Sequence, residues 1–316
     1  TKIITTHFDY HAIDHNLLKL DILGHQDPTM IRMLQDLIGI DPVKDIPLDS
    51  RETMTLFQNT DALGVKPEDL MGCKLGALGI PEFGTDFAMQ MLIDAKPKGL
   101  SDLVRISGLS HGTDVWLGNA QTLIQEGKAT IRTAICTRDD IMIYLIGQGM
   151  EEGESFKIME SVRKGKGLSP EYEQDMIAAD VPKWYIESCK KIKYMFPKAH
   201  AAAYVTNAFR IAWFKVHKPA AYYTAFFSVR SGGDFDATYM IYGLDKLKRK
   251  MDEIKELPKQ GVKEKGIYSL CEIVYEMNKR GIEFLPIDLY ESDAKKFKLI
   301  DENHILPPIS SIPGLR

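Results

Sequence analysis

The sequence predicts a mainly α-helical protein with a small β portion at the N-terminus and a β-hairpin near the C-terminus. Apolar residues recur at helical spacing through most of the chain, and proline or glycine ends one periodic run before the next begins. Strand patterns occur at residues 16–24 and 296–306. Together these patterns indicate a helical body with a little β structure near each end.

The composition is that of an ordinary folded protein. A chain of 316 residues is long enough for about two domains. Its net charge of −4 argues against a uniformly basic nucleic-acid binder, although clustered cations make local positive surfaces. The four cysteines form no C-x-x-C pair, which argues against a zinc knuckle and favours a reducing, cytoplasmic setting. There is no run of about 18 apolar residues and no signal-peptide pattern, so neither membrane insertion nor secretion is expected.

Residues 16–24 alternate as a strand that Gly24 closes. Lys19 and Asp21 share one face of this strand, about 7 Å apart, because successive side chains point to opposite faces. The strand therefore presents an ammonium and a carboxylate side by side. The alternative is a half-buried strand whose polar face carries a weak ion pair.

A second group of polar side chains precedes this strand. His7, Asp9 and His11 alternate onto one face, and Asp14 and His15 follow them. These residue types resemble a metal-ligand cluster. We favour the alternative that these residues do not bind a metal, because nothing in the sequence identifies the supporting residues and the open position that a metal site needs.

Three helices are expected next. Residues 28–39 carry an apolar stripe at helical spacing, and the polar connector after them indicates a boundary near residue 40. Ser50 is a suitable N-cap for a helix that reaches Phe57. A third helix spans residues 85–95, and Pro97 stops it.

A short helix at residues 101–106 leads into a segment rich in glycine and small hydroxyls, residues 107–118. His111 and Trp116 are expected to be exposed or half-exposed on this loop. Such loops let backbone N–H groups approach an anion or let a base lie against a ring. A plain connector between helices is the alternative.

Two further helices carry cations at their ends. Arg138 stands at the entrance of the helix at residues 137–146, and two aspartates occupy its first turn. The helix at residues 156–168 ends in glycines, with three cations at its exit: Arg163, Lys164 and Lys166. Cations near a helix C-terminus are also ordinary capping chemistry, which is the alternative interpretation.

Helices at residues 172–179 and 182–196 approach the most informative stretch of the chain. Pro197 launches a long amphipathic helix whose buried face runs from Ala201 to Val216. Its other face carries four residues: His200, Tyr204, Asn207 and Ile211. Lys198 and His200 lie at the helix N-terminus, where free N–H groups favour an anion, so the sequence outlines a phosphate site. The alternative is a solvated basic turn.

The last third of the chain continues with an aromatic-rich helix at residues 219–230. Asp234 and Asp236 form a D-x-D pair that could hold metals, but we favour Asp236 as the N-cap of a following helix. Residues 245–265 mix both charges at helical spacing, which is typical of a solvated helix face. Residues 296–300 and 304–306 are expected to form the hairpin.

Several motifs occur together and in order along essentially the whole chain. They are Leu17-Leu-Lys-Leu-Asp-Ile-Leu-Gly24, Gly79-Ile-Pro-Glu-Phe-Gly84, Gly108-Leu-Ser-His-Gly-Thr-Asp-Val-Trp-Leu-Gly-Asn-Ala120, Ile158-Met-Glu-Ser-Val-Arg-Lys-Gly-Lys-Gly167 and Phe196-Pro-Lys-Ala-His-Ala-Ala-Ala-Tyr204. This set resembles the PolC-type alpha subunit of bacterial DNA polymerase III, a C-family replicative polymerase. The resemblance implies that residues 1–40 are the end of the palm, residues 41–290 the helical fingers, and residues 291–316 a β-hairpin and the start of a helix-hairpin-helix module.

The resemblance also implies roles for the polar pair of the first strand. Asp21 is similar to the third catalytic carboxylate of the palm, which binds the two Mg²⁺ ions, and Lys19 lies beside it near the reacting phosphates. The other two carboxylates of the family lie on an earlier strand that this chain does not contain. One carboxylate cannot hold two ions. The fragment alone is therefore expected not to extend primers.

The remaining site residues follow from the other motifs. The candidates for the triphosphate of an incoming dNTP are Arg138, Arg163, Lys164, Lys166, Lys198 and His200. Ser110, His111 and Tyr204 are candidates for the neighbourhood of the nascent base pair. The implied partners are primer–template DNA, dNTPs, the rest of the polymerase chain, and the sliding clamp and other replisome proteins. Two alternatives remain: a non-catalytic nucleotide- or DNA-binding module, and a metal-dependent hydrolase built on His7, Asp9, His11 and Asp21.

Overall fold

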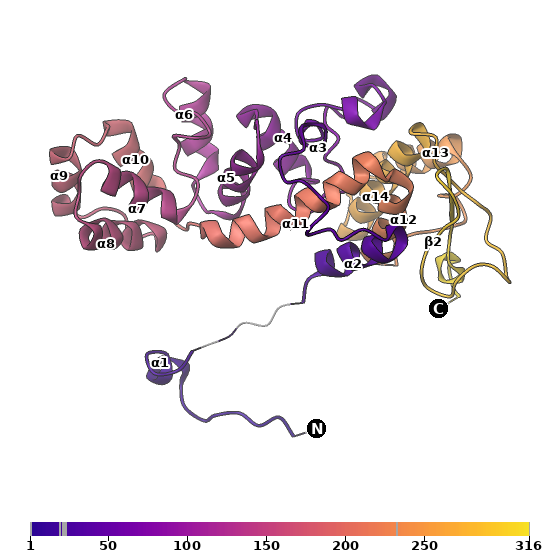
Figure 1. Ribbon diagram of the computed structural model, residues 1–316, viewed down its shortest axis with the longest axis horizontal. Coiled ribbons are helices and arrows are strands. Elements are labelled where there is room, and N and C mark those ends of the chain that lie inside the picture. The colour runs from indigo at the N-terminus through magenta and orange to yellow at the C-terminus, as the bar shows by residue number, and fades with distance from the viewer. Residues whose placement is uncertain (1, 19, 21–23, 232, 316) are drawn as a thin grey trace.

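The computed structural model describes residues 2–18, 20, 24–231 and 233–315. It is mainly helical, as the sequence predicts, and its body extends along one long helix, α11 (Figure 1). The helices within the described residues are α1 (Tyr10–Ile13), α2 (Gln26–Ile38), α3 (Arg51–Thr55), α4 (Asp86–Ala95), α5 (Leu100–His111), α6 (Gln121–Gln125), α7 (Arg138–Gly147), α8 (Glu152–Arg163), α9 (Pro170–Ala178), α10 (Lys183–Lys191), α11 (Lys198–His217), α12 (Pro219–Arg230), α13 (Leu244–Lys255) and α14 (Val262–Lys279). The strands are β1 (Glu283–Phe284), β2 (Lys298–Leu299) and β3 (His304–Leu306), and short helical turns are η1 (Asp61–Leu63), η2 (Pro67–Leu70), η3 (Trp116–Ala120) and η4 (Ile309–Ser311).

Helix α11 organises the body. It packs against α5, α12, α2 and α3, while α7 to α10 lie beyond its N-terminal end and α12 to α14 beyond its C-terminal end (Figure 1). Ala201, Val205 and Ala212 are fully buried, as the helical spacing predicts. Ile211, which the sequence places on the other face, is also fully buried. The reason is that α11 has packed neighbours on more than one side.

The predicted hairpin is confirmed and has a third strand. Strand β2 pairs antiparallel with β3, and β1 pairs with β3 in parallel, so the order in the sheet is β1-β3-β2. Four phenylalanines join this sheet to α12, with ring centroids 4.9–5.8 Å apart: Phe227, Phe235, Phe284 and Phe297. Strand β1 has two residues, too few to leave a pattern in the sequence.

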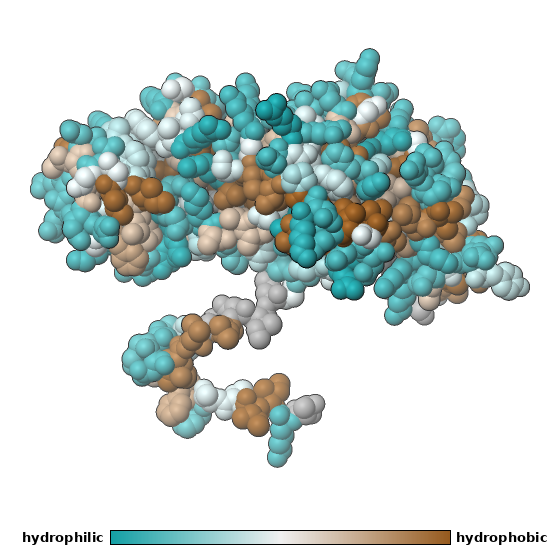
Figure 2. Space-filling view, in the orientation of Figure 1, coloured by the Kyte–Doolittle hydropathy of each residue, from teal (hydrophilic) through white to brown (hydrophobic). Residues whose placement is uncertain are grey.

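The predicted N-terminal strand is not confirmed. Residues 16–18, 20 and 24 carry no strand, and Lys19 and Asp21 lie outside the described residues. A strand needs a neighbour for its backbone N–H and C=O groups. The described residues offer none here, since residues 2–18 lie apart from the body in Figure 1. Figure 2 shows hydrophobic side chains exposed along this segment, and Ile3, Ile4 and Leu18 are each at least 85% exposed.

Three predictions are wrong: the end of the helix that begins near residue 101, the exposure of Trp116 and the cap at Asp236. Helix α5 continues to His111, and Trp116 is buried rather than exposed. Asp236 does not cap a helix, because Gly243, at φ +85°, separates it from α13. Its carboxylate instead accepts hydrogen bonds from the backbone N–H and hydroxyl of Thr238 at 2.8 and 2.6 Å, which closes a turn.

No helix within the described part of the chain combines the length and the apolar character that crossing a membrane requires.

Candidate functional site

The segment before α11, residues 192–197, is the meeting point of the candidate site residues. Thr113 and Tyr194 form an isolated antiparallel bridge, in which the Thr113 N–H donates to the Tyr194 carbonyl at 2.9 Å. The Arg138 N–H donates to the Phe196 carbonyl at 3.2 Å. A Cβ on Gly165 would lie 2.5 Å from the Lys193 carbonyl, so the loop after α8 also touches this segment. The end of α5, the start of α7, the exit of α8 and the start of α11 therefore converge.

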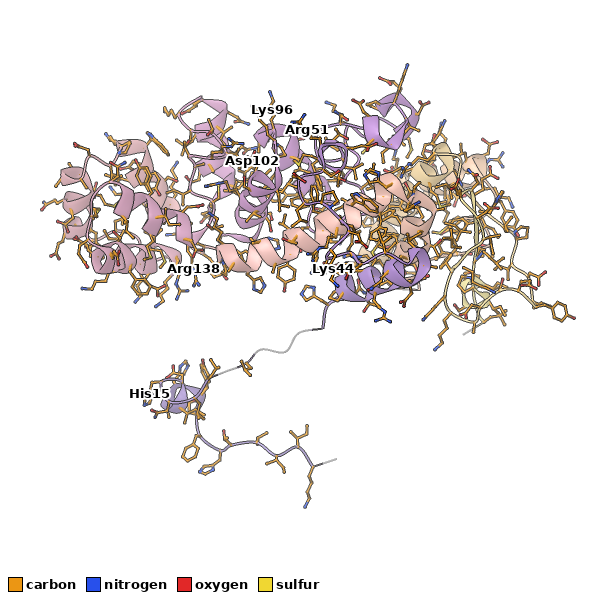
Figure 3. The ribbon with its side chains drawn as sticks, in the orientation of Figure 1. His15, Lys44, Arg51, Lys96, Asp102 and Arg138 are labelled. Carbon is orange, nitrogen blue, oxygen red and sulfur yellow. The ribbon has the colours of Figure 1, made fainter. Side chains whose placement is uncertain are left out.

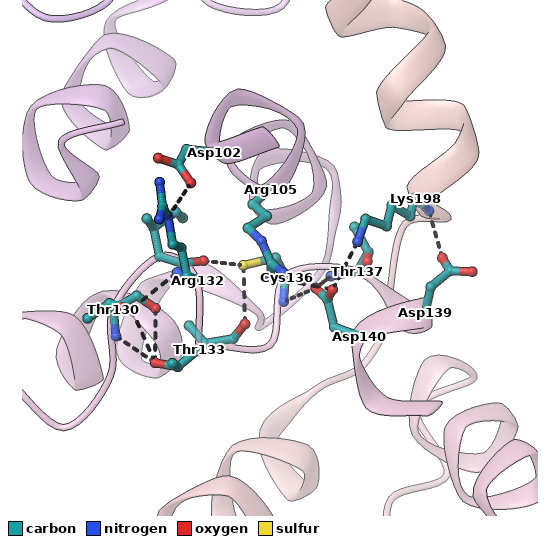
Figure 4. Close-up of polar contacts among 12 residues, drawn as sticks. Asp102, Arg105, Thr130, Arg132, Thr133, Cys136, Thr137, Asp139, Asp140 and Lys198 are labelled. Carbon is teal, nitrogen blue, oxygen red and sulfur yellow. Dashed lines mark hydrogen bonds and ion pairs between the residues drawn. The ribbon is translucent and has the colours of Figure 1, made fainter. Parts of the chain in front are cut away.

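The start of α11 already holds one carboxylate. Pro197, the N-cap residue, offers no side-chain hydrogen bond, and the Lys198 N–H donates to Asp139 Oδ2 at 2.8 Å (Figure 4). The N–H groups of Ala199 and His200 have no acceptor among the described residues. An anion at this helix start would therefore meet two free donors. It would also meet the negative charge of Asp139.

Asp140 ties three elements together (Figure 4). Its Oδ2 accepts hydrogen bonds from the N–H groups of Cys136 and Thr137 at 3.1 and 2.9 Å. Its Oδ1 lies 3.4 Å from Arg105 Nη1 on α5 and 3.7 Å from Lys198 Nζ on α11. Lys198 is thus held by a long ion pair while its side chain stays 40% exposed.

Unlike Lys198, Arg138 has no acidic partner among the described residues. It is half-buried at the first position of α7, and its guanidinium has no hydrogen bond or ion pair among the described residues. Figure 3 places it beside the N-terminal end of α11. Arg132, in contrast, lies 3.2 Å from Asp102 Oδ1. A guanidinium without an internal partner is free to bind a phosphate through two parallel hydrogen bonds.

The cations at the exit of α8 share one acid. Arg163 hydrogen-bonds to both oxygens of Glu160, and Lys164 Nζ lies 2.9 Å from Glu160 Oε2. The hydrogen bonds from Arg163 lower the pKa of Glu160 to about 2. Lys166 is exposed and has no side-chain partner in the described part of the chain. Arg163 and Lys164 share the single negative charge of Glu160, and Lys166 adds another positive charge. The net charge of this loop is therefore positive.

A row of aromatic rings borders the start of α11. His111 stacks on Phe196 at 4.7 Å, Phe196 meets His200 at 5.1 Å, and His200 meets Tyr204 at 4.5 Å. His25, just before α2, continues the row at 4.6 Å from Tyr204. A row of partly exposed rings offers faces on which a base can stack. Sequence analysis missed His25, because only the tertiary fold brings it beside α11.

The glycine-rich segment is explained by packing. A Cβ on Gly108 would lie 2.8 Å from the Cys136 carbonyl, and one on Gly112 3.0 Å from the Tyr194 carbonyl. Asn119 is buried and donates to the Asp114 and Ser188 carbonyls at 2.9 and 3.2 Å. The glycines therefore allow close contact between elements, and they do not form a phosphate-binding loop. Ser110 Oγ donates to the Ser107 carbonyl at 2.9 Å.

Within its described residues, the structure does not bring the predicted metal ligands together. Among these residues, no three His, Cys, Asp or Glu side chains form a group that could hold a metal ion. Asp9 instead caps α1 by accepting the His11 N–H at 2.9 Å. Lys19 and Asp21 lie outside the described residues. The donors among the described residues therefore do not form a set that suits a metal.

Comparison with known proteins identifies the family. A family profile described as bacterial DNA polymerase III alpha subunit finger domain matches residues 27–182. Three curated relatives are named DNA polymerase III PolC-type. The protein of Clostridium perfringens is 58% identical over 100% of this chain and 22% of its own length. The protein of Bacillus subtilis is 58% identical over 98% of this chain and 21% of its own length. The protein of Caldanaerobacter subterraneus is 55% identical over 100% of this chain and 22% of its own length.

The chain spans about a fifth of the length of these relatives. The matches confirm the resemblance carried by the five motifs. The chain belongs to the family of PolC-type alpha subunits of bacterial DNA polymerase III, and its residues 27–182 match the profile of the family's finger domain.

Proposed function

We propose that this chain is the part of a DNA-directed DNA polymerase that binds the incoming dNTP during templated synthesis in chromosomal replication. The observation that carries the proposal is the free guanidinium of Arg138 beside the start of α11. Two unsatisfied N–H groups, of Ala199 and His200, lie at the same helix start. Helix N-termini and arginine forks are the usual protein groups for phosphate oxygens.

The other cations have graded roles in this proposal. Lys198 is held near the helix start by Asp140 and neutralises charge at the triphosphate. Arg163, Lys164 and Lys166 keep the neighbouring loop positive and attract the nucleotide over a longer range. The rings of His111, His200 and Tyr204, with Ser110, border the nascent base pair, where a flat wall rejects a mispaired geometry.

We further propose that Asp21 supplies one carboxylate for Mg²⁺ and that Lys19 lies beside the reacting phosphates. Two-metal nucleotidyl transfer needs more than one carboxylate. The remaining ligands would come from the rest of the polymerase chain. Primer–template DNA is the proposed nucleic-acid partner, and the sliding clamp and other replisome proteins are proposed protein partners.

The proposed domain division places the end of the palm in residues 1–40 and the fingers in residues 41–290. Residues 291–316 would hold the β-hairpin and the start of a helix-hairpin-helix module. Residues 2–18 lie apart from the helical body (Figure 1), whereas α2 packs against α11 and α12, so the separation seen in the structure falls before α2. Strand β1 pairs with β3 across the second boundary, so the last two parts are packed together.

The test is the affinity of the complete polymerase for the incoming dNTP in an Arg138→Ala variant. Loss of charge-assisted hydrogen bonds to phosphate costs about 1.5–3 kcal/mol, so the dissociation constant should rise roughly 10- to 100-fold. Arg132→Ala is the matched control, because Arg132 is engaged by Asp102. Rapid-quench measurement of single-nucleotide incorporation gives the dissociation constant of the dNTP for each of the two variants. Equal affinities for Arg138→Ala and the unmodified enzyme would refute the proposal.

A further inference from the structure

The turn at residues 79–84 holds an acidic side chain in an unusual backbone conformation. Glu82 has φ +70°, a left-handed value that costs a non-glycine residue of order 1 kcal/mol. The turn closes tightly on itself, since a Cβ on Gly84 would lie 2.9 Å from the Gly79 nitrogen. The Glu82 side chain is 16% exposed and points at His111 at the end of α5. Strain of this kind persists only where the surroundings fix it.

Both ring nitrogens of His111 face acceptors. Nδ1 lies 2.7 Å from the Ser107 carbonyl oxygen, which can only accept, so this nitrogen carries a proton. Nε2 lies 3.3 Å from Glu82 Oε2. That oxygen is buried and makes no hydrogen bond of good angle, so the contact is a close polar approach rather than a directed hydrogen bond. A largely buried carboxylate oxygen needs a polar group facing it, and the His111 ring is the group that faces Glu82 Oε2.

The His111 ring in turn holds the start of α11. It stacks on Phe196 with centroids 4.7 Å apart and an interplanar angle of 23°. The Phe196 carbonyl accepts the N–H of Arg138, and Pro197 and Lys198 follow directly. A cleft of about 970 Å³ borders Glu82 and His111. The other charged residues along it are Asp86, Arg230, Lys255, Lys265 and Glu272.

We propose that Glu82 is a positioning residue for nucleotide binding. It holds the His111 ring in place against Phe196, and thereby fixes the ring row and the first turn of α11. The proposal rests on the proposed function, because it assumes that these rings border the incoming nucleotide. Nothing in the motif comparison assigns a role to Glu82, which acts through His111 and does not itself touch the nucleotide.

The test uses single-nucleotide incorporation by the complete polymerase with Glu82→Gln, which keeps the size and the backbone strain but removes the charge. KM for the dNTP should rise about tenfold, equivalent to 1.4 kcal/mol, while kcat stays within about twofold. Glu52→Gln is the matched control. Glu52 faces His217 at 3.8 Å near the other end of α11 and is 65% exposed, so its loss should leave KM unchanged.

A second pair of variants tests the charge coupling. His111→Phe keeps a ring on Phe196 but leaves the Glu82 carboxylate, whose Oε2 is buried, without the polar group that faces it, so it should lower the melting temperature and raise KM. Adding Glu82→Gln to His111→Phe should restore the melting temperature, because the orphaned charge is then removed. Additive losses in the double variant would overturn the inference.

The outcomes also separate this inference from the proposed function. If Arg138→Ala and His111→Phe raise KM and Glu82→Gln does not, Glu82 has no positioning role and the proposed function stands. If all three variants leave KM unchanged, the nucleotide does not bind here and both proposals fail.

Discussion

Arg132, Arg138 and Arg163 show what decides the use of a charge in this molecule. Arg132 and Arg163 are engaged by Asp102 and Glu160, while the guanidinium of Arg138 has no partner among the described residues. The sequence predicts Arg138 and Arg163 as cations at helix ends and does not single out Arg132. It could not rank them, because the compensating acid of Arg132 lies 30 residues away in the chain. Which arginine is free to bind a ligand therefore depends on the fold.

Glu272 gives a prediction at this scale. Burial raises its pKa to about 7, and the nearby Asp86 carboxylate adds to the rise. The unfolded chain ionises near the ordinary value of 4.5 and the native state only near 7, so stability falls as pH rises between these values. Glu272→Gln cannot ionise and escapes this loss. It should therefore be more stable than the unmodified chain by about 3 kcal/mol at about pH 8, and nearly equal at about pH 4.5.

Urea denaturation at the two pH values measures this difference. Glu256→Gln is the control, since Glu256 is exposed near the end of α13 and its loss should leave the pH dependence unchanged. A stability gain for Glu272→Gln that is the same at both pH values would show that the buried charge is not its cause.

Among the elements, local signals predict helix ends well. Ser50 and Thr85 cap α3 and α4 through their side chains, Gly39 ends α2 in a left-handed conformation, and Pro219 begins α12. These boundaries depend on residues within one turn of the helix end, which is why the sequence contains them. The failures depend on tertiary contacts. Helix α5 passes through Gly108 because a glycine there lets α5 approach the Cys136 backbone.

Lys215 is the clearest case of a residue whose role depends on how the elements pack together. It lies on α11 and is fully buried, and its Nζ donates to the Gly76 and Leu78 carbonyls at 2.8 and 2.6 Å. Glu276 Oε1 on α14 lies 2.7 Å from the same nitrogen. Burial lowers the pKa of Lys215, and Glu276 opposes this shift. The lysine thus joins α11, α14 and the segment before α4.

Lys215→Met should therefore destabilise the chain by about 3–5 kcal/mol, because it leaves Glu276 buried without its counter-charge. Denaturant unfolding followed by circular dichroism measures the loss. Lys218→Met, at an exposed position three residues on, should change stability by less than about 0.5 kcal/mol. Adding Glu276→Gln to Lys215→Met should recover part of the stability. A loss below about 1 kcal/mol for Lys215→Met would contradict this account of the core.

At the scale of the whole molecule, the sequence predicts the helical class, the C-terminal hairpin and the family. It could not predict the convergence at residues 192–197, because that depends on how α5, α7, α8 and α11 pack. The candidate site shows the same division. The motifs predict which residues belong to it, whereas the Asp139 carboxylate at the start of α11 comes from a residue 59 positions away from Lys198. Glu82 and His25 also enter only through the fold.

The most direct test of the central claim is a structure of the complete polymerase bound to primer–template DNA and a non-hydrolysable dNTP. We expect triphosphate oxygens within about 3.2 Å of the Arg138 guanidinium and of the N–H groups of Ala199 and His200, with the Asp21 carboxylate facing the same cleft. A triphosphate bound elsewhere, with Arg138 turned to solvent and Asp21 on another side of the molecule, would contradict the account.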